Sequence, residues 1–125
     1  MRRYHENQMR PWNLLMGAVL TTFAFGLAGC RKLPPSMPSS EWTPQEARGA
    51  TVFQAKCARC HNPNSTEPLH GPGLQAITKL KAMPSGAPPT DERLTATILD
   101  GRGMMPAAQV NDEQLADLLA YLHTL

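Results

Sequence analysis

A Cys-x-x-Cys-His pattern at residues 57–61 constrains this chain more than any other feature of its sequence. On one helical turn, the thiols of Cys57 and Cys60 can both reach the two vinyl groups of a haem and form thioether bonds with them. The imidazole of the next residue, His61, then lies under the iron as a fixed axial ligand. The motif therefore predicts one haem c, attached covalently through Cys57 and Cys60 and ligated by His61.

Two other kinds of site also use closely spaced cysteines. A structural zinc site needs four ligands, and the remaining candidates in this chain are Cys30, His70 and His123. A thioredoxin-like dithiol needs a strand–helix–strand setting, which the sequence does not offer, and in an exported chain it would tend to oxidise. Haem attachment explains the motif better than either alternative.

Composition limits the chain to one small domain. The 125 residues include 12 Lys/Arg and 10 Asp/Glu, but nine of each remain from residue 30 onward, so nothing suggests nucleic-acid binding. Only three aromatic residues follow Cys30, and a large apolar cofactor would supply core that a domain of this size lacks. No β-branched or aromatic run alternates with polar residues, so we expect an all-α fold.

Residues 1–29 have the pattern of a bacterial lipoprotein signal peptide. Three Arg precede an uncharged stretch at 14–27, which is too short to span a membrane but suits the apolar core of a signal peptide. The stretch ends in Leu-Ala-Gly-Cys, which resembles a lipobox and implies cleavage before Cys30 with lipid on its thiol. An uncleaved leader acting as a short anchor is the alternative. Both place the protein at a membrane of the bacterial cell envelope, on the periplasmic or outer face.

The lipidated Cys30 would be followed by a spacer that extends to residue 42. Three Pro and three Ser in the ten residues from Arg31 to Ser40 cannot build a helix or a core. We therefore expect residues 30–42 to form an extended tether, and residues 43–125 to form the folded domain.

The domain at 43–125 resembles class I c-type cytochromes with one haem. Gly49 and Phe53 stand four residues apart shortly before the cysteine motif, and Tyr121 lies near the end of the chain, as in that family. The resemblance implies three to five helices wrapped around one covalently bound haem. It also implies that the first and last helices cross where Gly49, Phe53 and Tyr121 meet.

Residues 70–74 resemble the Gly-Pro-x-Leu segment of the same family. There the proline carbonyl accepts a hydrogen bond from the ligand imidazole, so the resemblance implies that Pro72 orients His61 and makes it a stronger donor to iron. Leu74 is expected to pack against the haem. His70 is a conceivable iron ligand, but a loop histidine this close in sequence is more often solvated.

The family's second axial ligand is a Met directly before a Pro, after a short helix. Here Arg-Gly-Met-Met-Pro at 102–106 follows a predicted helix that Gly101 ends, so we assign Met105 as the ligand. Its thioether sulfur would raise the reduction potential relative to two nitrogen ligands. Met104 is expected to pack against the haem edge. Met83 also precedes a Pro but lacks the helix and the Gly before it; Met83 and Met104 remain alternatives.

Capping signals locate the helices of the domain. The first is predicted to begin at Thr43, with Glu46 completing a capping box, and the last at Asn111. In the last helix, apolar residues then recur on one face, at Leu115, Leu118, Leu119 and Leu122. Two further helices are expected at 74–82 and 94–100, the second restarted by Thr90 after a proline-rich loop.

Two filled axial positions leave the iron no site for a substrate, so the resemblance implies an electron carrier and not an enzyme. The expected partners are redox proteins of a membrane respiratory or dehydrogenase complex, and we expect no small-molecule substrate. Lys56 and Arg59 would flank the exposed haem edge and contact an acidic partner. The alternatives are a fixed haem subunit of a larger membrane oxidoreductase, or a haem enzyme or gas sensor with a labile sixth ligand.

Overall fold

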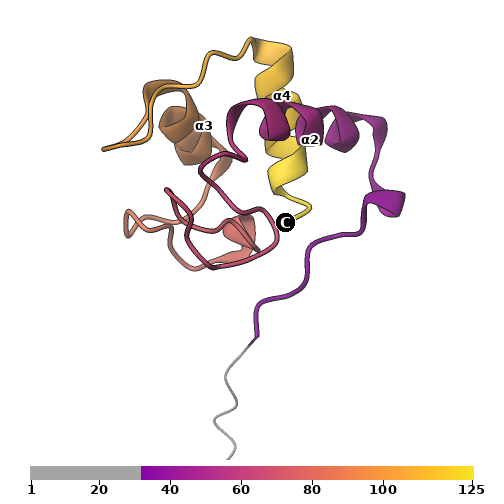
Figure 1. Cartoon of the computed structure of the whole chain (residues 1–125), viewed down its shortest axis with the longest axis horizontal. Coiled ribbons are helices and arrows are strands. Elements are labelled where there is room, and N and C mark those ends of the chain that lie inside the picture. The colour runs from indigo at the N-terminus through magenta and orange to yellow at the C-terminus, as the bar shows by residue number, and fades with distance from the viewer. Residues whose placement is uncertain (1–31) are drawn as a thin grey trace, which may run out of the picture. The chain divides into compact units, whose positions relative to one another are not determined.

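The computed structural model describes residues 32–125, so the expected signal peptide and Cys30 lie outside the described residues. Within this range the elements are η2 (Ser39–Glu41), α2 (Pro44–Lys56), η3 (Ile77–Lys79), α3 (Asp91–Asp100) and α4 (Asp112–Leu122), as Figure 1 shows. The same residues contain no strand, only an isolated bridge between Arg102 and Met105. The all-α prediction is confirmed. No helix among residues 32–125 has both the length and the apolar character needed to cross a bilayer.

The caps predicted from the sequence are present at the helix starts. Thr43 accepts a hydrogen bond from the Glu46 N–H at 3.3 Å and donates its own N–H to the Glu46 carboxylate at 2.5 Å. Asn111 and Gln114 form the same reciprocal pair at the start of α4. The Thr90 hydroxyl accepts a hydrogen bond from the backbone at the start of α3. Each cap satisfies backbone donors that would otherwise lack a partner.

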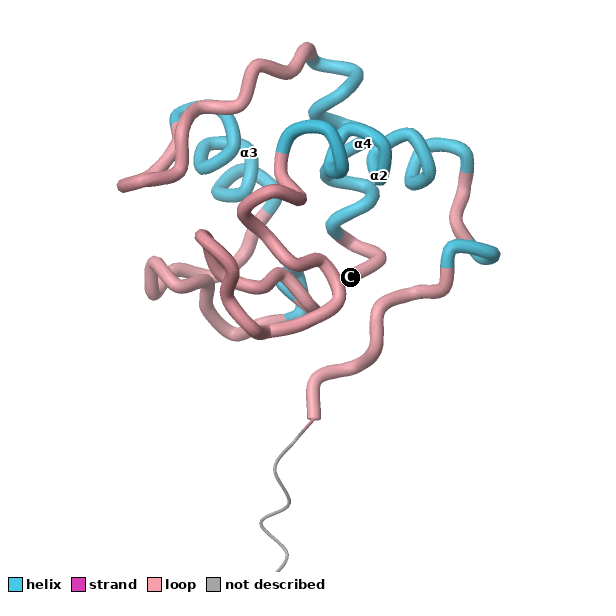
Figure 2. Tube along the Cα trace, in the orientation of Figure 1, coloured by secondary structure: helices cyan, strands magenta, loops and turns pink. Residues whose placement is uncertain are grey.

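The prediction of a helix at residues 74–82 is wrong. Only the three residues of η3 are helical there, and the chain between α2 and α3 is almost entirely loop (Figure 2). Leu74 donates its N–H to the carbonyl of Asn62 at 2.8 Å, and the buried Ala76 adopts a left-handed conformation with φ 56°. Tertiary hydrogen bonds and this change of direction outweigh the local helix propensity.

Helices α2 and α4 cross at Gly49, as the family resemblance implied. A Cβ at Gly49 would overlap the backbone carbonyl oxygen of Asp117 and lie 2.8 Å from the Cβ of Tyr121. The absence of a side chain therefore allows the two helices to touch through backbone atoms (Figure 1). Directly beside this contact, Arg48 donates two hydrogen bonds to the buried carboxylate of Asp117, at 2.8 and 2.9 Å.

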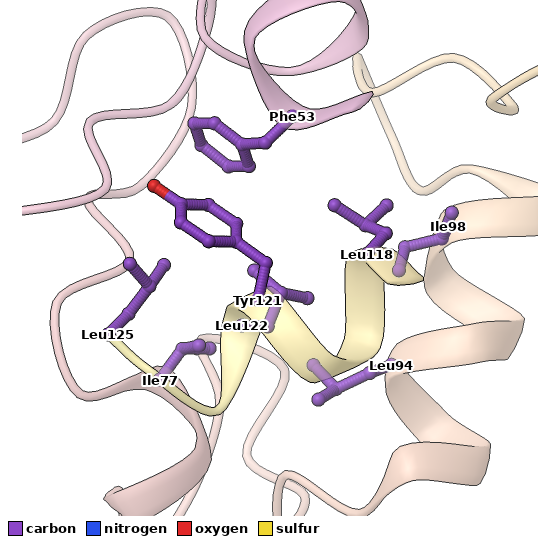
Figure 3. Close-up of a cluster of buried hydrophobic side chains, with 8 residues drawn as sticks. All are labelled: Phe53, Ile77, Leu94, Ile98, Leu118, Tyr121, Leu122 and Leu125. Atoms are coloured by element: carbon purple, nitrogen blue, oxygen red, sulfur yellow. The ribbon is translucent and has the colours of Figure 1, made fainter. Parts of the chain in front are cut away.

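The core lies on both sides of α4. In Figure 3 the rings of Phe53 and Tyr121 face each other, and Leu94 and Ile98 project from α3 toward α4. The two ring centroids are 5.3 Å apart with a tilt of 56°, a favourable aromatic arrangement. The full cluster consists of Phe53, Ile77, Leu94, Ile98, Leu118, Tyr121, Leu122 and Leu125.

The segment before α2 is bonded to the domain, whereas the sequence suggested an extended tether. The Met37 N–H donates to the carbonyl of Thr124 at 2.6 Å, and the Gln75 side-chain amide donates to the carbonyl of Pro34 at 3.1 Å. Trp42 packs edge-on against Tyr121 with centroids 5.3 Å apart. The compact unit accordingly begins at Leu33 and not at residue 43.

We expect Gly49→Ala to lower the free energy of unfolding by about 3 kcal/mol, because the new methyl group forces apart two packed backbones. In an exposed helix position the same change would be stabilising by up to about 1 kcal/mol. The exposed Gln54→Ala in the same helix is the control and should change stability by less than about 0.5 kcal/mol. Urea unfolding followed by circular dichroism measures both variants; equal stabilities would contradict the crossing.

Candidate haem site

The cysteine motif forms a turn directly after α2. Cys57 caps the helix and donates its N–H to the carbonyl of Phe53 at 2.8 Å. The N–H groups of Cys60 and His61 both donate to the carbonyl of Cys57, each at 3.0 Å. A hydrogen-bonded turn at residues 57–61 therefore follows the end of α2 directly and carries the two half-buried thiols.

The ring of His61 is oriented by Pro72, as the resemblance implied. Its Nδ1 lies 2.9 Å from the carbonyl oxygen of Pro72. Because a carbonyl oxygen only accepts, this contact places the ring proton on Nδ1 and leaves the lone pair on Nε2. Nε2 is therefore the nitrogen available to a metal, and a hydrogen-bonded imidazole is the more basic ligand.

Two backbone hydrogen bonds hold the Pro72 segment on either side of this contact. The Gly71 N–H donates to the carbonyl of Cys60, and the Leu74 N–H donates to that of Asn62, both at 2.8 Å. Together with the bond from His61 to Pro72, they tie residues 71–74 to residues 60–62 at three successive positions. The loop at residues 71–74, directly before most of the expected helix, is therefore the support of the histidine.

Gly71 contributes to this support in a way that the sequence reasoning missed. A Cβ at Gly71 would lie 2.6 Å from Cε1 of the His61 ring and 3.0 Å from each ring nitrogen. Gly73 is equally restricted, because a Cβ there would overlap the backbone of Ser65 and Thr66. The Gly-Pro-Gly sequence was the available clue, since glycines on both sides of a proline permit close approach of two backbones.

The electrostatics and surroundings of the thiols disfavour the rival sites. Burial, with a smaller effect of the neighbouring Cys60, raises the pKa of the Cys57 thiol above its ordinary value. A redox-active dithiol instead requires a lowered pKa. Among residues 32–125, no three His, Cys, Asp or Glu side chains gather as a metal cluster. Two closely spaced thiols beside an oriented imidazole are the groups that covalent haem attachment uses, so these residues fit a covalent haem.

Met105 is held in a tight hairpin after α3. Arg102 and Met105 exchange backbone hydrogen bonds of 2.9 and 3.0 Å, and the Ala108 N–H donates to the carbonyl of Ile98 in α3 at 2.8 Å. Gly101 ends the helix with φ 73°, and a Cβ there would lie 2.5 Å from the Met105 carbonyl oxygen. The sequence order of helix, Gly and Met, from which Met105 was predicted, thus corresponds to a hydrogen-bonded turn after α3.

The other predicted residues lie in different surroundings. Leu74 is half-buried and packs against the core. Met83, the alternative ligand, is also a partly buried residue packed against the core, which accounts for it without a role at iron. His70 is exposed. Met104 is 93% exposed at the hairpin, so no protein group covers it, and its contact with a haem edge stays a prediction.

We expect Gly71→Ala to displace the His61 ring and weaken its bond to Pro72. The imidazole then becomes a poorer donor, so the reduction potential of the haem-loaded protein should rise, and the stability should fall by about 1–3 kcal/mol. Pro72→Ala is the matched control, because it keeps both the carbonyl oxygen and the space beside the ring. Potentiometric titration of both variants tests this; an unchanged potential in Gly71→Ala would contradict the steric argument.

Comparison with known proteins gives the same interpretation. Residues 44–122 match the family model described as cytochrome c oxidase, cbb3-type, subunit III. The chain is 35% identical over 78 residues to cytochrome c6 of Bryopsis maxima, covering 59% of this chain and 84% of the relative. It is 27% identical over 114 residues to cytochrome c6 of Picosynechococcus sp., covering 87% of each.

The matched region spans both crossing helices, the cysteine turn and the methionine hairpin. The geometry of the cysteine turn and the sequence relationship agree on a covalently bound haem c. The sequence relationship identifies the chain as an electron carrier and not an enzyme. The chain belongs to the class I c-type cytochromes with a single haem.

Proposed function

We propose that this protein is a membrane-anchored electron carrier whose haem iron is ligated by His61 and Met105. The observation that carries the ligand assignment is the 2.9 Å contact between Nδ1 of His61 and the carbonyl of Pro72, which leaves Nε2 for the iron. The hairpin supports Met105, because two backbone bonds fix its backbone at the end of α3. The less exposed of the two adjacent methionines is Met105, in agreement with this choice.

The chain's own residues set the conditions for electron transfer. When bound, haem supplies an iron that gains or loses one electron. His61 and Met105 would fill both axial positions, so neither substrate nor gas would have a place at the metal. The soft sulfur of Met105 favours the reduced state and raises the potential. Attachment to a turn that is fixed to α2 limits movement when the charge changes, which keeps the reorganisation small.

Partner recognition would occur beside the cysteine turn. Lys56 and Arg59 are both exposed and lie on either side of Cys57, where the haem edge would approach the surface. Their charges suit a redox partner with acidic residues around its own electron-exchange site, and such pairing mainly accelerates encounter. We assign the partner to a membrane respiratory or dehydrogenase complex.

The anchor would be lipid on Cys30, after removal of residues 1–29 in the cell envelope. Two or three acyl chains hold a protein firmly at a bilayer, whereas one holds it only weakly. A fixed position inside a larger membrane complex is the second candidate, because the matching family model describes an oxidase subunit. Purification at constant stoichiometry with other subunits would separate a fixed subunit from a free carrier.

We expect Met105→Ala to abolish the weak ferric absorption band that sulfur ligation to haem iron produces. The potential should fall by on the order of 0.1 V or more, since axial ligands set haem potentials over about 0.8 V. The reduced variant should also bind carbon monoxide, which the parent protein should not. Met104→Ala is the matched control and should keep the band. A Met105→Ala variant that retains the band would refute the assignment, and carbon monoxide binding by the parent protein would favour a gas sensor.

We expect Cys30→Ser to prevent incorporation of labelled fatty acid in a bacterial host. Replacement of residues 1–30 by a cleavable secretory leader, which leaves no cysteine at that position, should release the haem-loaded domain into the soluble periplasmic fraction. Cell fractionation and haem staining measure both results. Continued membrane association after the leader replacement would show that the lipid is not the anchor.

A further inference from the structure

The segment Pro34–Trp42, here called the strap, makes hydrogen bonds to the folded domain at two separate points. Its Met37 N–H donates to the carbonyl of Thr124, and its Pro34 carbonyl accepts from Gln75. The Trp42 indole N–H donates to the carbonyl of Met37 at 3.1 Å, which closes the strap on itself. These contacts reach the end of α4 and the loop that supports His61.

The strap meets specific needs of the domain. Carbonyl groups just after a helix lack intrahelical partners, and Met37 supplies a donor to one of them at Thr124. Trp42 packs edge-on against the ring of Tyr121, which also contacts Phe53 in the core. An aromatic pair at this distance and near-perpendicular angle stabilises both rings beyond simple burial. The strap therefore extends the core by one aromatic layer.

The prolines that suggested a tether also favour an ordered strap. Pro34, Pro35 and Pro38 have fixed φ angles, so the unfolded segment has less conformational freedom to lose when it docks. A few hydrogen bonds and one tryptophan then suffice to hold it. The same composition thus serves a rigid strap better than a flexible spacer.

We propose that the strap belongs to the electron-carrier domain, so that the spacer behind a lipidated Cys30 would end at Pro34 and not at Thr43. This inference rests on the proposed anchor. Extended chain covers at most about 3.5 Å per residue, so the maximum reach falls from about 45 Å for a spacer ending at Thr43 to about 14 Å for one ending at Pro34. A membrane protein complex that serves as partner must then exchange electrons close to the bilayer surface, and not at a site far above it.

Hydrogen exchange on the full, lipidated, haem-loaded protein in detergent tests the strap. We expect the Met37 amide to exchange at least 100-fold more slowly than in an unstructured peptide, while the Lys32 amide exchanges at the unstructured rate. Trp42→Ala should remove most of this protection, and Trp42→Phe should retain more of it through the contact with Tyr121. Exchange of Met37 at the unstructured rate in the parent protein would overturn the strap.

Spacer length tests the partner. A ten-residue Gly-Ser insertion between Lys32 and Leu33 should slow reduction of the haem in isolated native membranes roughly fivefold, because effective concentration falls as about the −3/2 power of linker length. An unchanged or faster rate would overturn the short-range partner. Failure of the proposed anchor is distinguishable from failure of the strap, since it would show as continued membrane association of the domain after replacement of residues 1–30 while Met37 stayed protected.

Discussion

The backbone contact between Gly49 and Asp117 is the constraint on which the rest of the domain depends. It brings α2 against α4 so closely that Phe53, one turn further along α2, meets Tyr121. Because Cys57 caps α2 and its N–H is bonded to the carbonyl of Phe53, this crossing also fixes where the cysteine turn begins. The ion pair of Arg48 with Asp117 lies beside the contact and joins the two helices at the crossing point. A pair with one exposed partner adds little stability, so backbone packing remains the main term.

The two sides of the haem site are built by different means. On the histidine side, three successive hydrogen bonds join residues 71–74 to the cysteine turn, and Gly71 lets the backbone lie against the imidazole. On the methionine side, a glycine-containing hairpin is fixed by its own two bonds and by one bond to α3. Neither side relies on a long helix. Glycine at close approaches, combined with backbone hydrogen bonds, therefore gives the rigidity that an electron carrier needs.

The sequence predicted those features whose cause is local or carried by a motif. The caps at Thr43, Thr90 and Asn111 depend on residues three positions apart, and the structure confirms each of them. The resemblance to the family correctly predicted the helix crossing at Gly49 and the hydrogen bond from His61 to the carbonyl of Pro72. The helix expected at residues 74–82 rested on local propensity and was wrong, because the hydrogen bond from Leu74 to Asn62 and the left-handed Ala76 belong to a loop that local propensity does not describe.

The strap was missed for a related reason. Low helix propensity and a high proline content indicate only that a segment is not helical, and they apply equally to a free tether and to a docked extended chain. What separates the two is the availability of partners, such as the Thr124 carbonyl and the Tyr121 ring, which become neighbours only after α4 has folded. For tethered domains in general, the working length of a linker is therefore set by the last residue that finds a partner on the domain. With the proposed lipid on Cys30, that residue would be Pro34, and a boundary at residue 43 would overestimate the reach of the domain.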